Sequence, residues 1–289
     1  VKKVIPGHIL TIHESGKTTN EKWWDLKAEI QNQPKINNPV EWFRETFDDS
    51  IKLRMVSDVP VGVLLSGGLD SSSILASLNH QNFREIQTFN IGFKEKEHNE
   101  SHLAKKMSDK FGYGFHTMQL EDNALFEKLV NSTYFQDEPI MHLSEPHILA
   151  LSQMAKPSVK VLLSGEGADE LMGGYVRYKA LKYPSLLKVI ATVGHMDYFT
   201  TKPRFEKLAR YSQIGTYDDL ILYNGSNIFP KDIEKTFGIK NPPKNEYRNQ
   251  ILEDAKSLYP NNLRRQALYF DQHTYLCSLL DRNDRCTMG

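Results

Sequence analysis

From Val59 onward, short apolar runs rich in β-branched residues alternate with stretches of helical periodicity. This alternation is typical of a parallel sheet covered by helices, because parallel strands need long crossover connections. Two of the runs, Val61–Leu65 and Val159–Leu163, are apolar apart from Lys160, so we expect them in the centre of the sheet, buried on both faces. The pattern predicts strands at Val61–Leu65, Ile86–Ile91, Gly114–Leu120 and Val159–Leu163, and helices at Ser71–Asn79, Glu100–Phe111 and Ser144–Met154.

The segments on either side of this alternating region differ from it. Before it, a β-like run around Ile9–Ile12 is followed by a loop rich in Asn, Gln and Pro from Gln31 to Pro39, which indicates a domain linker. A helix is expected from about Pro39 to Met55, because Asn38 can cap it and proline is favoured at the first helical position. After Tyr175 the pattern is mostly helical, with interruptions at Pro203, Gly215, Pro230 and Pro242.

The composition excludes several classes of protein. Of the 289 residues, 39% are hydrophobic and 25% are charged, which suits a soluble globular protein and not a disordered chain. The 36 basic and 36 acidic residues cancel, so no overall field holds the chain to nucleic acid or to an anionic membrane. No apolar run is long enough to span a bilayer, and the two cysteines suit reduced thiols. We therefore expect a cytoplasmic protein with neither nucleic acid nor membrane as a partner.

A glycine- and serine-rich octet directly follows the first predicted strand. Its sequence is Ser66-Gly67-Gly68-Leu69-Asp70-Ser71-Ser72-Ser73, and a helix is expected to begin within it. The glycines allow a tight turn and a close approach to an anion, while the hydroxyls and the free N–H groups of the new helix can donate hydrogen bonds. The octet therefore predicts a phosphate-binding loop. It is not a Walker P-loop, since no lysine lies between Arg54 and Lys94.

A second glycine-rich turn, Ser164-Gly165-Glu166-Gly167, follows the last predicted strand. Because the carboxyl ends of parallel strands meet at one edge of a sheet, Glu166 and Asp169 are expected at the same edge as Asp70. Three carboxylates at a phosphate site would repel one another unless a cation neutralised them. Mg²⁺ suits this task, since it binds one or two carboxylates together with phosphate oxygens and water.

These motifs resemble those of a known enzyme family. The octet is similar to the PP-loop of the N-type ATP pyrophosphatases, which cleave ATP between its α and β phosphates. Two flanking stretches, Ser57–Gly62 and Leu163–Tyr175, closely resemble the synthetase domain of the glutamine-dependent asparagine synthetases. The stretch Thr88–Phe93 resembles the family's second strand, which flanks the adenine, and Asp284–Met288 resembles its DR-S-M segment. The resemblance covers nearly the whole chain and is loose over residues 195–270.

The resemblance implies a fold and a set of site residues. The implied fold is α/β, a doubly wound parallel sheet of five strands with helices on both faces, similar to the adenine nucleotide alpha-hydrolases and followed by a mostly helical C-terminal part. Asp70 and Asp169 would bind Mg²⁺, and Glu166 would act as base or orienting group for ammonia in acyl transfer. The residues implied for ATP binding are Leu64, Ser66, Gly67, Gly68, Asp70, Ser71, Ser72, Ile91, Ser164 and Gly165.

The resemblance also implies a domain organisation. Residues 1–37 would be the remnant of an N-terminal glutaminase domain with its linker, and residues 38–289 an ATP-dependent synthetase domain that is incomplete at its C-terminus. In the family, residues beyond the DR-S-M segment contribute to the substrate pocket. A chain that ends at Gly289 is therefore expected to bind nucleotide and to be deficient in synthesis. The resemblance leaves a homodimer open.

The implied activity is ATP-dependent asparagine synthesis. An ionised carboxylate resists nucleophiles, so the aspartate side chain would first be adenylated with release of pyrophosphate, and ammonia would then displace AMP. In the family the ammonia comes from glutamine, through the glutaminase domain that this chain is expected to lack. Two alternatives stay open. One is a β-lactam-synthetase-like enzyme or another amidotransferase that adenylates a different carboxylate, and the other is a non-catalytic relative that serves in binding or assembly.

Overall fold

The computed structural model describes residues 3–94, 99–120, 122–182, 216–223, 225–226, 228–239 and 245–288. The chain forms two compact units. The sheet unit consists of Lys35–Ala168 and Ser278–Gly289, and the helical unit consists of Val1–Pro34 and Asp169–Cys277. Each unit is therefore assembled from two separate stretches of the chain.

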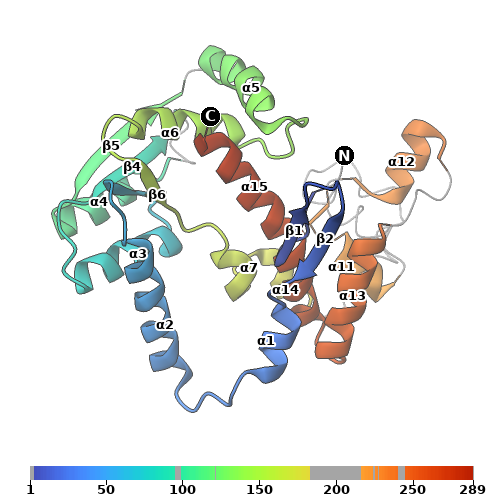
Figure 1. Ribbon diagram of the computed structural model, residues 1–289. Coiled ribbons are helices and arrows are strands. Elements are labelled where there is room, and N and C mark those ends of the chain that lie inside the picture. The colour runs from blue at the N-terminus through green and yellow to red at the C-terminus, as the bar shows by residue number, and fades with distance from the viewer. Residues whose placement is uncertain are drawn as a thin grey trace, which may run out of the picture. The chain divides into compact units, whose positions relative to one another are not determined.

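The sheet unit is built on four parallel strands (Figure 1). They are β3 (Val61–Leu64), β4 (Gln87–Gly92), β5 (Gly114–Gln119) and β6 (Val161–Leu163). All three neighbouring pairs are parallel, which confirms the α/β class. The prediction of five strands is wrong for the described residues, because the chain after β6 enters short helices instead of a further extended run.

The strand order, β5-β4-β3-β6, creates a reversal of direction beside β3. From β3 the chain moves outward to β4 and β5, and β6 then pairs with the opposite side of β3. In open α/β sheets, ligands bind outside the carboxyl ends of the strands at such a reversal. The two glycine-rich loops follow β3 and β6, so both leave the sheet at this point.

The placement of β6 in the centre of the sheet is a second expectation that is wrong. Among the described strands β6 lies at an edge, and β4 takes the inner position beside β3. The sequence misleads here because β4 carries the polar residues Thr88 and Asn90, which are nonetheless buried. Their side chains are hydrogen-bonded to neighbouring elements, which makes their burial tolerable.

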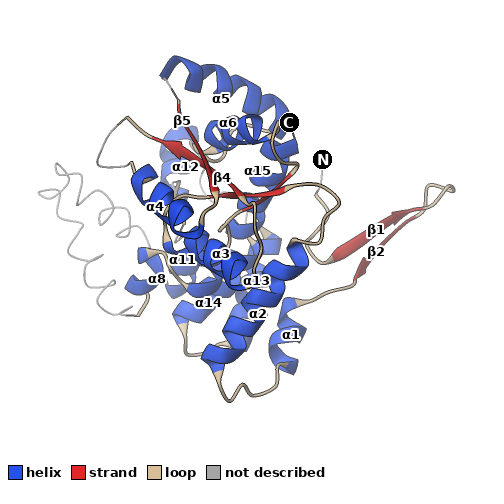
Figure 2. Cartoon of the chain, turned by 90° about the vertical axis from the view of Figure 1, so that its left-hand side faces the viewer, coloured by secondary structure: helices blue, strands red, loops and turns tan. Residues whose placement is uncertain are grey.

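Helices cover both faces of the sheet (Figure 2). One face carries α3 (Leu69–His80) and α4 (Ser101–Phe111), with α2 (Pro39–Arg54) packed on α3. The other face carries α6 (Glu145–Ala155), on which α5 (Asp122–Gln136) packs. The sequence pattern predicted all of these helices except α5.

Capping residues mark the helix boundaries, and the predicted cap at Asn38 is confirmed. Asn38 accepts a hydrogen bond from the N–H of Glu41 at the start of α2, and Pro39 occupies the first helical position. Gly112 ends α4 in the left-handed conformation, with φ 69°. α3 begins at Leu69, inside the glycine- and serine-rich octet, so its first turn is also part of that loop.

Side chains of β3 alternate between the two faces of the sheet. Val63 and Leu65 pack into the core beneath α3, with Leu75 and Leu78, whereas Leu64 packs against the cluster on the α6 face. This alternation confirms that the apolar run after Pro60 is buried on both sides.

The helical unit begins with an antiparallel hairpin of β1 (His8–Ile12) and β2 (Thr18–Lys22). The predicted linker is wrong at its start, because Gln31 and Asn32 belong to a helix, α1 (Leu26–Asn32). Pro230 opens a helix, and Pro203, Gly215 and Pro242 lie outside the described residues. The other described helices of the unit are α8 (Val176–Ala180), α11 (Tyr217–Leu222), α12 (Pro230–Phe237), α13 (Glu246–Leu258) and α14 (Leu263–His273).

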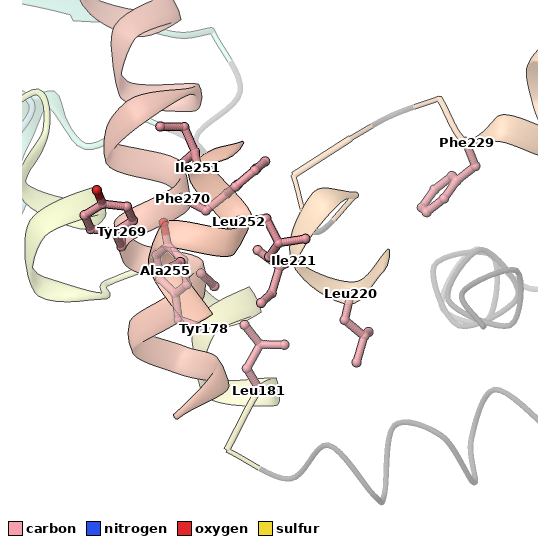
Figure 3. Packing of buried hydrophobic residues seen from close by; sticks show 11 residues of the cluster. Tyr178, Leu181, Leu220, Ile221, Phe229, Ile251, Leu252, Ala255, Tyr269 and Phe270 are labelled. Atoms are coloured by element: carbon pink, nitrogen blue, oxygen red, sulfur yellow. The ribbon is translucent and has the colours of Figure 1, made fainter. Parts of the chain in front are cut away.

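Side chains from α8, α11, α13 and α14 form the core of the helical unit (Figure 3). A buried polar network runs beside this core, in which Asp271 accepts hydrogen bonds from Arg177 and from the hydroxyl of Tyr178. Burial, reinforced by the neighbouring Asp271 carboxylate, raises the pKa of Tyr178 and keeps its hydroxyl protonated. Two helices, α7 (Ala168–Met172) and α15 (Tyr275–Met288), contain residues of both units. No described helix has the length and apolarity needed to cross a membrane.

Candidate active site

The loop after β3 is held together by its own hydroxyl groups. The N–H of Ser66 donates to Oγ of Ser71 (3.2 Å), and the two hydroxyl oxygens lie 3.0 Å apart. The N–H of Gly68 donates to Oγ of Ser66 (3.2 Å), and Oγ of Ser71 donates to the carbonyl of Gly68 (3.4 Å). These bonds close the loop over the first turn of α3. Ser66 and Ser71 therefore shape the loop itself.

Gly67 makes a close approach between the loop and α4. Its φ is +87°, in the left-handed region that favours glycine. A Cβ at this position would lie 2.8 Å from the backbone nitrogen of Ala104 and 3.0 Å from Cβ of Leu103. Both the backbone conformation and the space around it thus require glycine.

Gly165 makes a similar approach from the second loop. A Cβ there would lie 3.1 Å from Cβ of Asp70 and 3.1 Å from the backbone nitrogen of Ser71. The loop after β6 therefore lies against the first turn of α3, as the switch-point topology predicts. The structure brings Ser164 and Gly165 to the same edge of the sheet as the octet.

One polar atom of the octet is buried without a partner. Oγ of Ser72, in the first turn of α3, has no hydrogen-bond partner among the described residues. The neighbouring Ser73 differs, since its Oγ donates to the carbonyl of Leu69 (2.8 Å). A buried hydroxyl without a partner is costly, so Ser72 is suited to bind a group from outside the chain.

Leu64 and Ile91 occupy one face of the sheet next to the loop. Both pack on the apolar cluster that Phe89 and Leu151 form on the α6 face. They lie at the carboxyl ends of neighbouring strands, since β3 ends at Leu64 and β4 at Gly92. An apolar, half-buried surface therefore adjoins the octet on this side.

Glu166 forms an ion pair that the sequence did not predict. Its Oε1 lies 2.6 Å from Nη2 of Arg282 in α15. The Arg282 side chain is 6% exposed and that of Glu166 is 31% exposed, so the carboxylate is held at the surface by a buried cation. Arg282 lies two residues before the segment that resembles DR-S-M, so that resemblance does not identify it.

Arg282 is in turn fixed by polar partners. Its Nη1 donates to Oγ of Ser144 (2.8 Å), and both Nε and Nη2 donate to Oδ1 of Asn283. Nearby, Nε2 of His142 lies 2.8 Å from Oγ of Ser278. Burial, together with the positive charge of Arg282, lowers the pKa of His142 and favours its neutral form.

Asp169 lies in the first turn of α7, on the helical unit's side of the division. Its carbonyl accepts hydrogen bonds from the N–H groups of Gly173 (2.8 Å) and Gly174 (3.2 Å). A Cβ at Gly174 would lie 1.8 Å from Oδ1 of Asp169, so this glycine makes room for the carboxylate. Gly173 and Gly174 thus contact the backbone of Asp169, and Gly174 also adjoins its side chain.

The described residues contain no group of three or more His, Cys, Asp or Glu side chains arranged for a metal ion.

Residues 42–289 match the family model for asparagine synthase, which is most of the chain. The chain belongs to the asparagine synthase family. Both glycine-rich loops lie within the matched residues. It also confirms the resemblance drawn from the octet and from the stretch after β6.

Several curated relatives of the family match this chain. Asparagine synthetase [glutamine-hydrolyzing] 1 of Bacillus subtilis is 34% identical over 180 residues, which cover 62% of this chain and 28% of that protein. Asparagine synthetase [glutamine-hydrolyzing] 3 of the same organism is 25% identical over 311 residues, covering 100% of this chain and 45% of that protein. Amidase chry2 of Gibberella zeae is 28% identical over 201 residues, covering 62% of this chain and 30% of that protein. The chain thus spans less than half the length of these relatives.

Among solved structures, the U34-tRNA thiolase NcsA of Methanococcus maripaludis matches with a TM-score of 0.36 and 12% identity. The match covers 82% of this chain and 80% of that chain.

Proposed function

We propose that the protein is an ATP-dependent carbon–nitrogen ligase that makes asparagine. The aspartate side-chain carboxylate is adenylated, pyrophosphate leaves, and ammonia then displaces AMP to form the amide. The observation that carries the proposal is the meeting of the two glycine-rich loops at the switch point, where Gly165 lies against Asp70 and Ser71. Two of the relatives are named asparagine synthetases, which supports the choice of reaction.

The residues around the octet fit a nucleotide. The buried Oγ of Ser72 offers a hydrogen bond that no described residue takes up, and the first turn of α3 presents N–H groups and a positive dipole end to phosphate. Gly67, Gly68 and Gly165 allow the backbone to approach the anion closely. Leu64 and Ile91 supply an apolar surface suited to the adenine ring. Ser66 and Ser71 complete the octet, and Ser164 lies in the second loop, next to Gly165.

Asp70 and Asp169 are the carboxylates that we propose for Mg²⁺. The ion would offset the charge that develops on the leaving pyrophosphate. Asp70 stands in the first turn of α3, next to the proposed phosphate position, and the space around Asp169 is kept open by Gly174. The rest of the coordination would come from phosphate oxygens and water.

Glu166 is the residue that we propose for the acyl-transfer step, as base or orienting group for ammonia. The Arg282 guanidinium holds one carboxylate oxygen, Oε1, at 2.6 Å. The partly exposed carboxylate is thereby fixed in direction, which suits a group that accepts a proton from an attacking amine. We propose that the ammonia comes from glutamine, because the asparagine synthetase relatives are named glutamine-hydrolyzing.

A second candidate is amidation of a different carboxylate. The relative named Amidase chry2 favours it, because a protein whose name gives a different activity aligns with 62% of this chain, as one of the synthetases does. The adenylation chemistry and the roles of the loop residues would be the same. Only the acceptor would differ.

Product analysis tests both candidates. With ATP, Mg²⁺, aspartate and ammonium, the full-length protein should release AMP and pyrophosphate in step with asparagine, as chromatography of nucleotides and amino acids would show. Formation of ADP and phosphate would rule out the PP-loop chemistry. AMP formation that needs another carboxylate in place of aspartate would favour the second candidate.

Ser72→Ala should separate nucleotide binding from stability. The substitution removes a buried hydroxyl without a partner, so we expect the free energy of unfolding to stay unchanged or to rise by up to about 1 kcal/mol. The affinity for Mg·ATP should fall about fivefold to tenfold, because a hydrogen bond to the ligand is lost. Urea unfolding and calorimetric titration measure the two effects.

Ser73→Ala is the matched control, since the Ser73 hydroxyl is already bonded to the carbonyl of Leu69. It should leave the affinity for Mg·ATP near that of the unmodified protein. Equal affinities in the two variants would show that Ser72 does not bind the nucleotide.

A further inference from the structure

Asn90 is a buried polar residue of β4 that neither the octet nor the second loop contains. It is 4% exposed, and its side chain contacts three different elements. Nδ2 donates to the carbonyl of Leu65 (2.7 Å), while Oδ1 accepts from the hydroxyls of Ser101 (2.6 Å) and Thr117 (3.2 Å). Because a carbonyl can only accept, the atom facing Leu65 must be the amide nitrogen. Every polar atom of the Asn90 side chain is thus used.

The contact with Leu65 fixes the first peptide unit of the loop. The carbonyl of this unit belongs to Leu65 and accepts from Asn90, and its N–H belongs to Ser66 and donates to Oγ of Ser71. β3 is paired with β4 only as far as Leu64, so the Asn90 side chain supplies a donor just past the last paired residue. A peptide held at both its oxygen and its nitrogen cannot rotate about the chain direction. The direction in which the loop leaves the sheet is therefore set by Asn90 on one side and Ser71 on the other.

The contact with Ser101 fixes the opposite wall of the loop. Ser101 is the first residue of α4, and the first turn of that helix lies against Gly67, where a Cβ would be 2.8 Å from the backbone nitrogen of Ala104. The bond from Ser101 to Asn90 therefore ties the start of α4 to the same side chain that holds Leu65. The loop is confined between these two attachments.

We infer that Asn90 is a positioning residue that sets the shape of the nucleotide loop, acting through Leu65 and Ser101 without touching the nucleotide. The inference rests on the proposed function, since it assumes that the octet binds ATP. It extends the site to a residue of β4, the strand that lies between β3 and β5.

Thr88 offers a matched comparison in the same strand. It lies two residues before Asn90 and faces the same side, and its hydroxyl donates to the carbonyl of Gly114 (2.7 Å) and to Oγ of Ser108 (3.1 Å). Thr88 is 0% exposed and links β4 to β5 and α4, as Asn90 does, but at the end of the strand away from the loop. A purely structural role predicts similar behaviour for the two residues.

Asn90→Asp tests the inference with little change in shape. The new carboxylate can still accept from Ser101 and Thr117, but it places an oxygen against the carbonyl of Leu65 where a donor is needed. We expect the dissociation constant for Mg·ATP to rise on the order of tenfold, by calorimetric titration. In steady state the KM for ATP should rise more than kcat falls, and the KM for ammonium should not change.

Thr88→Val should lower the melting temperature without changing the dissociation constant for Mg·ATP. Equal dissociation constants for Asn90→Asp and the unmodified protein, or an equal rise in Thr88→Val, would overturn the inference. Failure of the unmodified protein to bind Mg·ATP would instead overturn the proposed function.

Ser101→Ala serves if Asn90→Asp does not fold, because it removes only the attachment of α4. It should raise the dissociation constant for Mg·ATP about threefold or more. Thr117→Val, which removes the longer bond from β5, should leave that constant near the value of the unmodified protein. An unchanged constant in Ser101→Ala would contradict the inference.

Discussion

Glu166→Gln is expected to lower the rate of amide formation by about a hundredfold or more, while ATP and the acceptor still react to release pyrophosphate. Glutamine keeps the size of the side chain and can still accept a hydrogen bond from Arg282, but it cannot take a proton from the attacking amine. General bases typically contribute factors of about 10² to 10⁴ to a rate. Exchange of labelled pyrophosphate into ATP measures the first half-reaction, and asparagine release measures the second.

The Asp137–Arg285 pair provides the control for this experiment. It also joins a carboxylate to an arginine of α15, at 2.9 Å, but the Asp137 side chain is 79% exposed. Asp137→Asn should change neither half-reaction by more than about twofold, since surface ion pairs contribute little. A comparable loss of amide formation in both variants, or loss of pyrophosphate exchange in Glu166→Gln, would contradict the assignment of Glu166 to acyl transfer.

Gly67→Ala is expected to lower the free energy of unfolding by about 2 to 5 kcal/mol. The left-handed conformation costs an alanine about 1 to 2 kcal/mol, and a close contact in a packed region costs about 1 to 3 kcal/mol more. The contact is with the backbone of α4, which cannot move aside as a flexible side chain would. Urea unfolding measures the loss, and binding of Mg·ATP should weaken with it because the loop is displaced.

Gly112→Ala is the matched control, because Gly112 has a similar φ, +69°, with nothing within 4 Å of the added Cβ. It should cost only about 1 to 2 kcal/mol, the cost of the left-handed conformation alone. If the two variants lost the same stability, the close approach of α4 to the loop would be refuted as the cause.

Much of the sheet unit could be predicted because its signals are local. The apolar run at β3 and the capping residue Asn38 each act through neighbours in the sequence, and the structure has them where expected. The edge position of β6 could not be predicted in this way. Burial of Thr88 and Asn90 in β4 depends on hydrogen bonds to distant residues, so the polarity of that strand concealed its inner position.

The same distinction applies to the candidate site. Glycine spacing after a strand is a local pattern, and the close approaches at Gly67 and Gly165 agree with it. Arg282 lies 116 residues beyond its partner Glu166, and no local sequence pattern indicates that the two residues are paired. Asn90 could not be identified from the sequence either, because its proposed role depends on the positions of Leu65 and Ser101 in the folded structure. The magnesium assignment of Asp70 and Asp169 stays a prediction.

The division of the sheet unit into two stretches has a consequence for the order of events during synthesis. Residues 35–168 leave the ribosome with every strand of the described sheet and with Glu166, but without residues 278–289. More than a hundred residues of the helical unit are translated before Arg282 follows. Until then the nascent sheet carries a carboxylate whose counter-charge does not yet exist, together with the surface of α6 that Cys286 later covers. The Glu166–Arg282 ion pair can therefore form only after residue 282 has been translated, and a nascent chain halted before that residue would carry the glycine- and serine-rich octet together with an unpaired Glu166.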